Sequence, residues 1–521
     1  MELVLMTFKI NSFVFCLVAF SVMASADEIS QPPNILFIMS DDHAERAISS
    51  YGSDLIDTPN IDRIAREGVR FANSFVTNSI CAPSRAVLLT GKYSHVNGLR
   101  DNRDTFDGSQ VTLPKLLQSA GYQTAIIGKW HLKSDPTGFD VWKILVSQGR
   151  YYNPVFIDNG TEVQREGYVT DVITDLAIDY LDGRDESKPF ALLYQHKAPH
   201  RNWMPHPRHF VNEAHEYPLP DTFWDDYAGR PAAAGQDMRI ADMWLSMDMK
   251  LQADHYGDET GTGGHDQFDP TDSWANDYGR MTEEQKTAWD AHYKAVGEKF
   301  NAARPSGRAL AEWKYQRYMR DYMGSVAAVD EGVGQLLDYL EEHDLVDNTI
   351  VVYTSDQGFY LGEHGWYDKR FMYEESLRTP LMIRYPPEIK AGQVRDELVL
   401  NLDMSPTLLD LANVAIPTDM QGQSLRPLMS EPAPAEWRDA IYYRYYEFPH
   451  GWHKVRPHYG VRTDRYKLIH FEGDMNVWEL YDLQSDPNEL HNLYGQDEYS
   501  ATQDALHRRL GELQRELGDV R

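Results

Sequence analysis

Residues 34–42 read NILFIMSDD, and this stretch decides the fold. Its short apolar run predicts a strand that is buried on both faces, which is typical of a parallel sheet. Similar runs occur at 124–127, 190–194 and 349–353, with helical patterns between them. This alternation predicts an α/β fold in which helices cover both faces of a mostly parallel sheet.

The helical patterns have clear ends. Thr58 and Pro59 open a helix over 59–67 that stops at Gly68, as an N-cap, a first-turn proline and a terminal glycine do. Further helices are expected near 83–90 and at 113–119, 169–182 and 315–343.

Two segments depart from the alternation. Residues 201–312 are rich in Asp, Gly, Trp and His, with loop-like composition at 258–265, and we interpret them as a long insertion near the rim of the site. The chain from 431 is strand-rich and ends in a predicted helix over 502–517, which predicts a small α+β subdomain over 431–521. The catalytic domain is then expected over 27–430.

Residues 1–26 have the pattern of an export signal peptide, with Lys9 before an apolar run over 13–22 and the small-residue sequence ASA at 24–26. The alternative is a membrane anchor, but this run is short for a bilayer span. No later segment has the length and apolar character of a span. The mature chain is therefore expected to be exported, periplasmic or secreted, and to keep one cysteine, Cys81.

The chain has 521 residues, with 50 Lys and Arg against 80 Asp and Glu, a formal net charge of −30. Such an excess of acid argues against a nucleic-acid partner, because binding there depends on basic groups that displace counterions from phosphates. It argues equally against adhesion to anionic lipid. Taken alone, it also predicts weak binding of anionic substrates.

Reactive polar residues follow four of the predicted strands, as SDD at 40–42, GKWH at 128–131, QHKAPH at 195–200 and SDQG at 355–358. In parallel sheets of this kind, ligands bind beyond the carboxyl ends of the strands. Any one cluster is more simply interpreted as a solvated turn. Four clusters at one edge of the sheet predict a functional site.

Two of these clusters supply oxygen ligands, the carboxylates of Asp41, Asp42 and Asp356 and the amide of Gln357. Such a set suits Ca²⁺ or Mg²⁺, and the lack of clustered Cys or closely spaced His ligands argues against zinc. The alternative is a hydrogen-bonded carboxylate network without metal. It is unfavourable, because three neighbouring carboxylates repel one another.

Cys81 begins the sequence CAPSR at 81–85, beside the helix that Pro83 is expected to open. A helix N-terminus attracts anions, and Arg85 offers a planar fork for a tetrahedral oxyanion. The alternative is that Cys81 is a small buried apolar residue, as free cysteines usually are.

The sequence CAPSR, continued by GKY at 91–93, resembles the signature of the formylglycine-dependent sulfatases of the alkaline-phosphatase-like superfamily. The resemblance runs from about residue 34 to residue 493 and includes WELYDL at 478–483. It implies a large mixed, mostly parallel sheet between helices, with a C-terminal subdomain of antiparallel sheet plus helix. One departure is Gln357, where many members carry Asn or His.

The resemblance also implies the active site. Cys81 would be oxidised to 3-oxoalanine (formylglycine) by a formylglycine-generating or an anaerobic sulfatase-maturating enzyme. One Ca²⁺, in preference to Mg²⁺, would be held by Asp41, Asp42, Cys81, Asp356 and Gln357. The catalytic residues would be Cys81, Arg85, Lys129, His131, His200 and Lys369.

The implied mechanism begins with hydrated formylglycine, which attacks sulfur in line after Asp356 removes a proton. His200 is the candidate acid for the leaving oxygen, with His131 second. The second hydroxyl of the diol then expels sulfate, which a serine could not do. Arg85, Lys129 and Lys369 would hold the sulfate oxygens or the diol.

Among sulfatases, the chain resembles bacterial enzymes that act on sulfated carbohydrates. The acidic composition suits a saline exterior, so an algal glycan such as ulvan or carrageenan is the preferred substrate. The alternative is an N-acetylglucosamine-6-sulfatase acting on glycosaminoglycan or mucin-type glycans. A phosphate monoester or phosphonate hydrolase, or a silent glycan-binding protein, is disfavoured by the CAPSR sequence and by the complete set of catalytic residues.

Several polar or aromatic residues near these motifs are candidates for sugar contacts, with a structural role as the equal alternative. They are Arg100, Asp101, Arg201, Trp203, His206, Glu363, His364 and Arg370.

Overall fold

The central strand β1 (Asn34–Ser40) lies between two parallel neighbours, β8 (Phe190–Gln195) and β9 (Thr349–Ser355), in a computed structural model of the chain. The structure describes residues 32–251, 274–430, 434 and 436–520. The predicted signal peptide at 1–26 and the predicted loop at 258–265 lie outside these residues.

Within the described part of the chain, the large sheet has ten strands in the order β11-β2-β10-β9-β1-β8-β4-β5-β6-β7. The centre, β9 to β5, is parallel, and β10, β6 and β7 add antiparallel pairings. The remaining strands of this sheet are β2 (Val69–Phe71), β4 (Gln123–Gly128), β5 (Val141–Leu145), β6 (Val155–Asp158), β7 (Thr161–Gln164), β10 (Leu381–Arg384) and β11 (Gln393–Arg395). The expected mixed, mostly parallel sheet is thus confirmed.

Both faces of the sheet are buried, and β1 shows why. Ile35, Phe37 and Met39 belong to one hydrophobic core, and Leu36 and Ile38 belong to the core on the other face. The first core packs against α2 (Cys81–Thr90), α4 (Leu113–Ser119), α12 (Met404–Leu411) and α13 (Arg426–Met429). The second packs against α1 (Pro59–Glu67), α5 (Val169–Asp182) and α10 (Gly307–Glu342).

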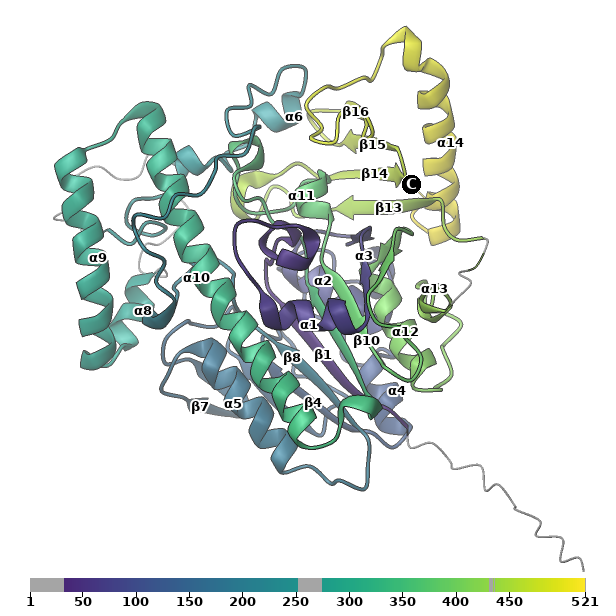
Figure 1. Cartoon of the computed structure of the whole chain (residues 1–521). Coiled ribbons are helices and arrows are strands. Elements are labelled where there is room, and N and C mark those ends of the chain that lie inside the picture. Colours follow the sequence, from purple (N-terminus) through teal and green to yellow (C-terminus); the bar gives the residue numbers. More distant parts are fainter. Residues whose placement is uncertain (1–31, 252–273, 431–433, 435, 521) are drawn as a thin grey trace, which may run out of the picture. The chain divides into compact units, whose positions relative to one another are not determined.

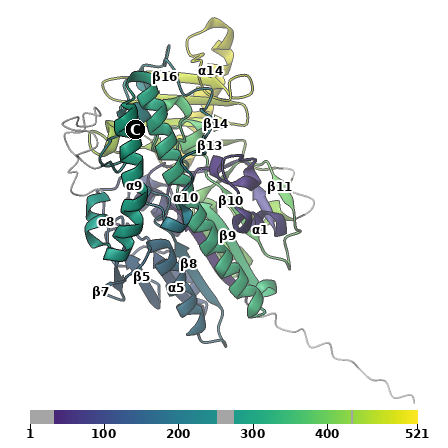
Figure 2. The same cartoon turned by 60° about the vertical axis from the view of Figure 1, so that its left-hand side comes forward.

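Helix α10 lies beside α5 and α1 along the sheet in both views (Figure 1, Figure 2). It begins at Gly307, eight residues before the expected start, because the end of the predicted insertion is already helical. The insertion also contains α6 (Pro231–Ala234), α8 (Trp274–Arg280) and α9 (Glu283–Ala303). A capping box at Thr282 and Gln285 starts α9.

The C-terminal part forms an antiparallel sheet of β13 (Ala440–Tyr445), β14 (His458–Thr463), β15 (Tyr466–Phe471) and β16 (Val477–Asp482). Helix α14 (Ser500–Leu517) packs on it through Leu506, Leu510 and Leu513 (Figure 1). The expected C-terminal sheet plus helix is confirmed. Two short strands, β3 (Ser74–Phe75) and β12 (Val399–Leu400), pair with each other, and the short helices α3 (Ser94–Asn97) and α11 (Glu374–Leu377) lie in connecting segments.

Among the residues that the structure describes, no helix combines the length and the apolar character needed to cross a membrane.

Candidate active site

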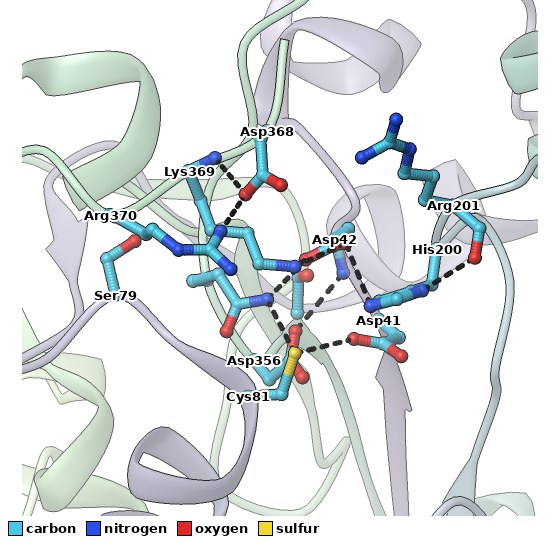
Figure 3. A network of polar contacts seen from close by, with 12 residues as sticks. Asp41, Asp42, Ser79, Cys81, His200, Arg201, Asp356, Asp368, Lys369 and Arg370 are labelled. Carbon is cyan, nitrogen blue, oxygen red and sulfur yellow. Dashed lines mark hydrogen bonds and ion pairs between the residues drawn. The ribbon is translucent and has the colours of Figure 1, made fainter. Parts of the chain in front are cut away.

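The carboxyl ends of β9, β1, β8 and β4 meet at one edge of the large sheet. Ser40 pairs with Ser355, Met39 pairs with Gln195, and Gln195 also pairs with Gly128. The polar clusters that follow these residues therefore converge, as predicted (Figure 3).

Three carboxylates form the centre of the site. Asp41, Asp42 and Asp356 each offer an oxygen within 4.8 Å of the others, and all three residues are buried. Asp42 has a left-handed backbone, with φ of 64°, and its N–H donates to Oδ1 of Asp356 at 3.1 Å. The left-handed turn thus brings two consecutive aspartates toward the end of β9.

Each carboxylate has a cationic partner. Lys129 contacts Asp41, and Nζ of Lys369 lies 2.5 and 2.6 Å from the two carboxylate oxygens of Asp42. Arg85 donates from Nε to Oδ2 of Asp356 at 3.0 Å, and its Nη2 lies 3.0 Å from the same oxygen. Each of the three carboxylates is thus paired with one cationic side chain.

The pKa values follow from burial and from these charges. Burial favours the neutral acid, but the charges of Lys129 and Arg85 outweigh it at Asp41 and hold the pKa of Asp41 well below its ordinary value. Burial raises the pKa of Asp42 to about 6, against the opposing effect of Lys369. Burial, together with the charge of Asp41, raises the pKa of Asp356 to about 7.

The donor set fits a hard divalent cation. Gln357 approaches the carboxylates through its amide, whose Nε2 lies 2.5 Å from Oδ1 of Asp42 and 3.7 Å from Sγ of Cys81. Within the described part of the chain its buried Oε1 has no hydrogen-bond partner, and a half-turn of the amide would exchange the two atoms. Three carboxylate oxygens and one amide oxygen then match the ligands that Ca²⁺ and Mg²⁺ prefer.

Cys81 is the first residue of α2, two residues before the expected start of this helix, and it is 1% exposed. Its Sγ lies 3.5 Å from Oδ1 of Asp41. Burial raises the pKa of the Cys81 thiol to about 12, although Lys129 and Lys369 oppose it. The unmodified thiol is therefore neutral near pH 7 and is a poor nucleophile.

Hydrogen bonds also fix the side chains of Arg85 and His200. Nη1 of Arg85 donates to the carbonyl of Lys129 at 2.9 Å and to Oε1 of Gln195 at 2.7 Å. Nδ1 of His200 donates to the carbonyl of Arg201 at 2.8 Å, so its Nε2 faces Oδ2 of Asp42 at 3.7 Å. His131 has φ of 60°, and its buried Nδ1 has no hydrogen-bond partner among the residues that the structure describes.

Burial lowers the pKa of both histidines well below the ordinary value. At His131 the charge of Lys129 adds to this effect, whereas at His200 the charge of Asp41 opposes it. Both imidazoles are therefore neutral near pH 7 when no ligand adds charge to the site.

Two of the candidate sugar contacts lie near this centre (Figure 3). Arg370 has φ of 94° and pairs with Asp368, whose own φ is 78°. Arg201 donates twice to Asp248, at 2.7 and 2.8 Å, and its guanidinium lies 5.0 Å from the ring centre of Trp452.

The structure contradicts the prediction that Trp203 contacts a sugar. It is fully buried, and its ring centre lies 4.7 Å from that of Tyr318, 6.3 Å from that of Phe359 and 6.2 Å from that of Tyr367. The ring is covered by the core, so it offers no face on which a sugar could stack.

The other candidates are engaged in contacts of their own. His364 is fully buried and bonds to Asp225 at 2.8 Å, and Glu363 pairs with Arg46. Asp101 accepts from Arg103, and Nδ1 of His206 accepts the N–H of Arg208 at 3.2 Å. Arg100 is exposed, and its carbonyl accepts from Asn78 at 3.0 Å. These contacts favour a structural role for His364, Glu363, Asp101 and His206.

Sequence reasoning did not select Asp248 or Asp368, although both fix an arginine beside the site. Asp368 directly precedes Lys369, and an acid next to two cations in the sequence DKR at 368–370 was a usable signal. Asp248 lies in the insertion without periodicity, where nothing distinguishes it from its acidic neighbours.

The chain matches two models of protein families. The family model described as "Sulfatase" matches residues 33–414, and the model described as "N-sulphoglucosamine sulphohydrolase, C-terminal" matches residues 362–516.

The chain is 49% identical over 522 residues to the N-acetylglucosamine-6-O-sulfatase of Bacteroides thetaiotaomicron, which covers 98% of this chain and 91% of that protein. It is 49% identical to a solved structure described as a complex with its substrate D-glucosamine-2-N,6-O-disulfate, with a TM-score of 0.88 over 94% of this chain and 99% of that one. The ulvan-active sulfatase of Formosa agariphila is 26% identical over 503 residues, 94% of this chain and 82% of that protein.

Proposed function

The chain belongs to the sulfatase family and is a carbohydrate sulfatase, and from this premise we propose that it removes the 6-O-sulfate of a glucosamine unit. The observation that supports this choice of substrate is the 49% sequence identity, over almost the full length of the chain, to an N-acetylglucosamine-6-O-sulfatase. N-acetylated and N-sulfated glucosamine are both candidate units.

This proposal replaces the preference for an algal glycan such as ulvan. That preference depended on the acidic composition, and the comparisons do not support it, because the ulvan-active relative is only 26% identical. Net charge is a poor guide to the substrate because electrostatic interactions at the surface are screened over about a Debye length, roughly 8 Å in physiological salt. The sugar is selected by contacts inside the site.

The proposed nucleophile is residue 81 after oxidation of Cys81 to formylglycine. The burial and the high pKa of the thiol support this, because an unmodified Cys81 would stay protonated. The hydrated aldehyde would supply one hydroxyl to attack sulfur and a second to release sulfate afterwards. A maturating enzyme, formylglycine-generating or anaerobic, is the implied partner.

Asp41, Asp42, Asp356 and Gln357, with residue 81, would hold one Ca²⁺. Ca²⁺ is favoured over Mg²⁺ because it accepts more protein oxygens in less regular geometry. The cation would draw charge from the sulfate oxygens and lower the pKa of a hydroxyl bound to it.

The charges of the site are suited to an anion. Lys129, Lys369 and Arg85 already balance the three carboxylates, so a bound divalent cation leaves two positive charges in excess. We propose that this local excess binds the sulfate ester despite the net charge of −30. The three cationic side chains would stabilise charge on the sulfate oxygens as the ester bond breaks.

His200 is our proposed acid for the leaving sugar oxygen. Its hydrogen bond to the carbonyl of Arg201 fixes the ring, so Nε2 is the nitrogen directed at the carboxylates. In the unliganded site Nε2 carries no proton, because the imidazole is neutral and its hydrogen is on Nδ1. The negative charge of a bound sulfate ester would raise the pKa of His200, so that Nε2 takes up a proton and passes it to the sugar oxygen as the sulfur–oxygen bond breaks. His131 is the second candidate.

The test compares wild-type protein and Cys81→Ala, both produced with a maturating enzyme. Wild type is expected to release sulfate from N-acetylglucosamine-6-sulfate faster than from ulvan oligosaccharides or an aryl phosphate, and Cys81→Ala is expected to melt normally without turnover. A mass spectrum of the peptide containing residue 81 checks the aldehyde. Full activity in Cys81→Ala, or an unmodified thiol in active wild type, would overturn the mechanism, and a preference for ulvan would overturn the substrate.

A further inference from the structure

The turn that carries Asp41 and Asp42 is anchored by a side chain 280 residues further along the chain. Tyr322 lies on α10, and its hydroxyl donates to the carbonyl of Asp42 at 2.7 Å. The same hydroxyl accepts the N–H of Ala44 at 2.8 Å. The buried hydroxyl oxygen of Tyr322 thus makes hydrogen bonds on both sides of the turn in which Asp42 has a left-handed backbone.

We propose that Tyr322 is a positioning residue for the cation site and that its hydroxyl sets the affinity for Ca²⁺ by fixing the turn at Asp42. The inference depends on the proposed function, since it assumes that Asp41 and Asp42 are cation ligands. A ligand that must be ordered at the moment of binding costs free energy, and an anchored ligand does not.

The ring of Tyr322 reaches the second ligand segment as well. It stacks on Phe359, with ring centres 5.9 Å apart and an angle of 18°. Phe359 follows Asp356 and Gln357, and its ring centre lies 5.6 Å from Nζ of Lys369. Tyr322 therefore contacts both segments that carry the proposed ligands, one through its hydroxyl and one through its ring.

The alternative role is packing alone. Tyr322 lies on the apolar stripe of its helix, where the sequence pattern predicts a core residue. Phenylalanine keeps the ring, its burial and the stacking on Phe359, and it removes only the hydroxyl. Tyr322→Phe therefore separates the two roles.

Tyr315 provides the matched control, because it lies on the same helix and is fully buried. Its hydroxyl donates at 2.7 Å to the carbonyl of Pro218, in the insertion. Tyr315→Phe thus removes one buried hydroxyl of the same type away from the ligand segments. Tyr318 is unsuitable, because it donates to the carbonyl of Tyr360, three residues after Gln357.

The experiment is calorimetric titration of calcium chloride into full-length, chelator-treated protein. Tyr322→Phe is expected to bind Ca²⁺ about 10–100-fold more weakly than wild type, the usual effect of removing a group that orients a ligand. Tyr315→Phe is expected to bind as wild type does. Saturating calcium should restore most of the turnover number of Tyr322→Phe, because the lost hydroxyl touches no substrate.

Unchanged Ca²⁺ affinity in folded Tyr322→Phe would overturn the inference. So would a variant that is unfolded without calcium and stays unfolded in millimolar calcium, since that result would mean that the hydroxyl supports the fold as a whole and not the cation site in particular. A wild-type protein that binds no Ca²⁺ would refute the proposed cation, and this inference with it. Wild type that binds Ca²⁺ and releases sulfate, beside an unaffected Tyr322→Phe, would refute only the role of Tyr322.

Discussion

Replacement of Lys369 by methionine tests the charge balance of the site. Nζ of Lys369 lies 2.5 Å from Oδ1 of Asp42, and the side chains of the two residues are 4% and 1% exposed. Methionine keeps an unbranched apolar side chain of similar length and removes the charge. Asp42 would then be a buried carboxylate that has lost its partner.

Removal of one partner from a buried ion pair typically costs about 3–5 kcal/mol of unfolding free energy, because the other charge stays desolvated. We expect that loss for Lys369→Met in a chelator. In calcium the loss should shrink, because a divalent cation at Asp42 replaces the missing charge. Sulfate release should fall by about 100-fold or more, the usual effect of removing a group that stabilises transition-state charge.

The assay is urea unfolding followed by tryptophan fluorescence, with and without calcium. Lys92→Met is the control, because Lys92 pairs with Asp419 at 2.5 Å but the partner side chain is 62% exposed. An exposed pair contributes about 0–1 kcal/mol. Equal losses in the two variants, or a loss in Lys369→Met that calcium does not reduce, would refute the reasoning.

Two further substitutions test buried residues. Trp203→Ala should lower the unfolding free energy by about 3–5 kcal/mol, as truncation of a core aromatic does, and leave KM unchanged in the folded protein; a raised KM at normal stability would indicate substrate contact. Burial raises the pKa of Glu479 from 4.5 to about 7. Between these pH values folded Glu479 keeps a proton that the unfolded chain loses, so the unfolding free energy falls as the pH rises. That fall is about 3 kcal/mol, and Glu479→Gln should lack it in thermal melts across this range, whereas an unchanged pH dependence would contradict the assignment.

The central strands were predictable from the sequence because burial on both faces demands an unbroken apolar run. The predicted strand at 190–194 is β8 (Phe190–Gln195), and the predicted helix at 169–182 is α5 (Val169–Asp182). The strands β5, β6 and β7, on one side of the sheet, were not predicted. In β7 (Thr161–Gln164), three of the four residues are exposed, so the sequence TEVQ carries no apolar signal.

The site was predictable to a similar degree and for a topological reason. Parallel strands place the residues after their carboxyl ends at one edge, so Asp41, Lys129, His200 and Asp356 could be grouped without a structure. Long-range partners could not, because the contact of Tyr322 with Asp42 joins positions 280 residues apart. Trp203 was misread because sequence alone does not show whether an aromatic residue faces the core or a ligand.

The left-handed residues at the site have a consequence for engineering. Asp42, His131, Asp368 and Arg370 all have positive φ, which costs a residue with a side chain roughly 1–2 kcal/mol and glycine almost nothing. At Asp42, Asp368 and Arg370 the loss of a buried ion pair, about 3–5 kcal/mol, outweighs this cost, but at His131 selection for heat resistance alone would favour glycine and remove a candidate catalytic side chain in the process. A screen for a more durable enzyme has to measure sulfate release in the same step as survival, because stability and chemistry are in opposition at this residue.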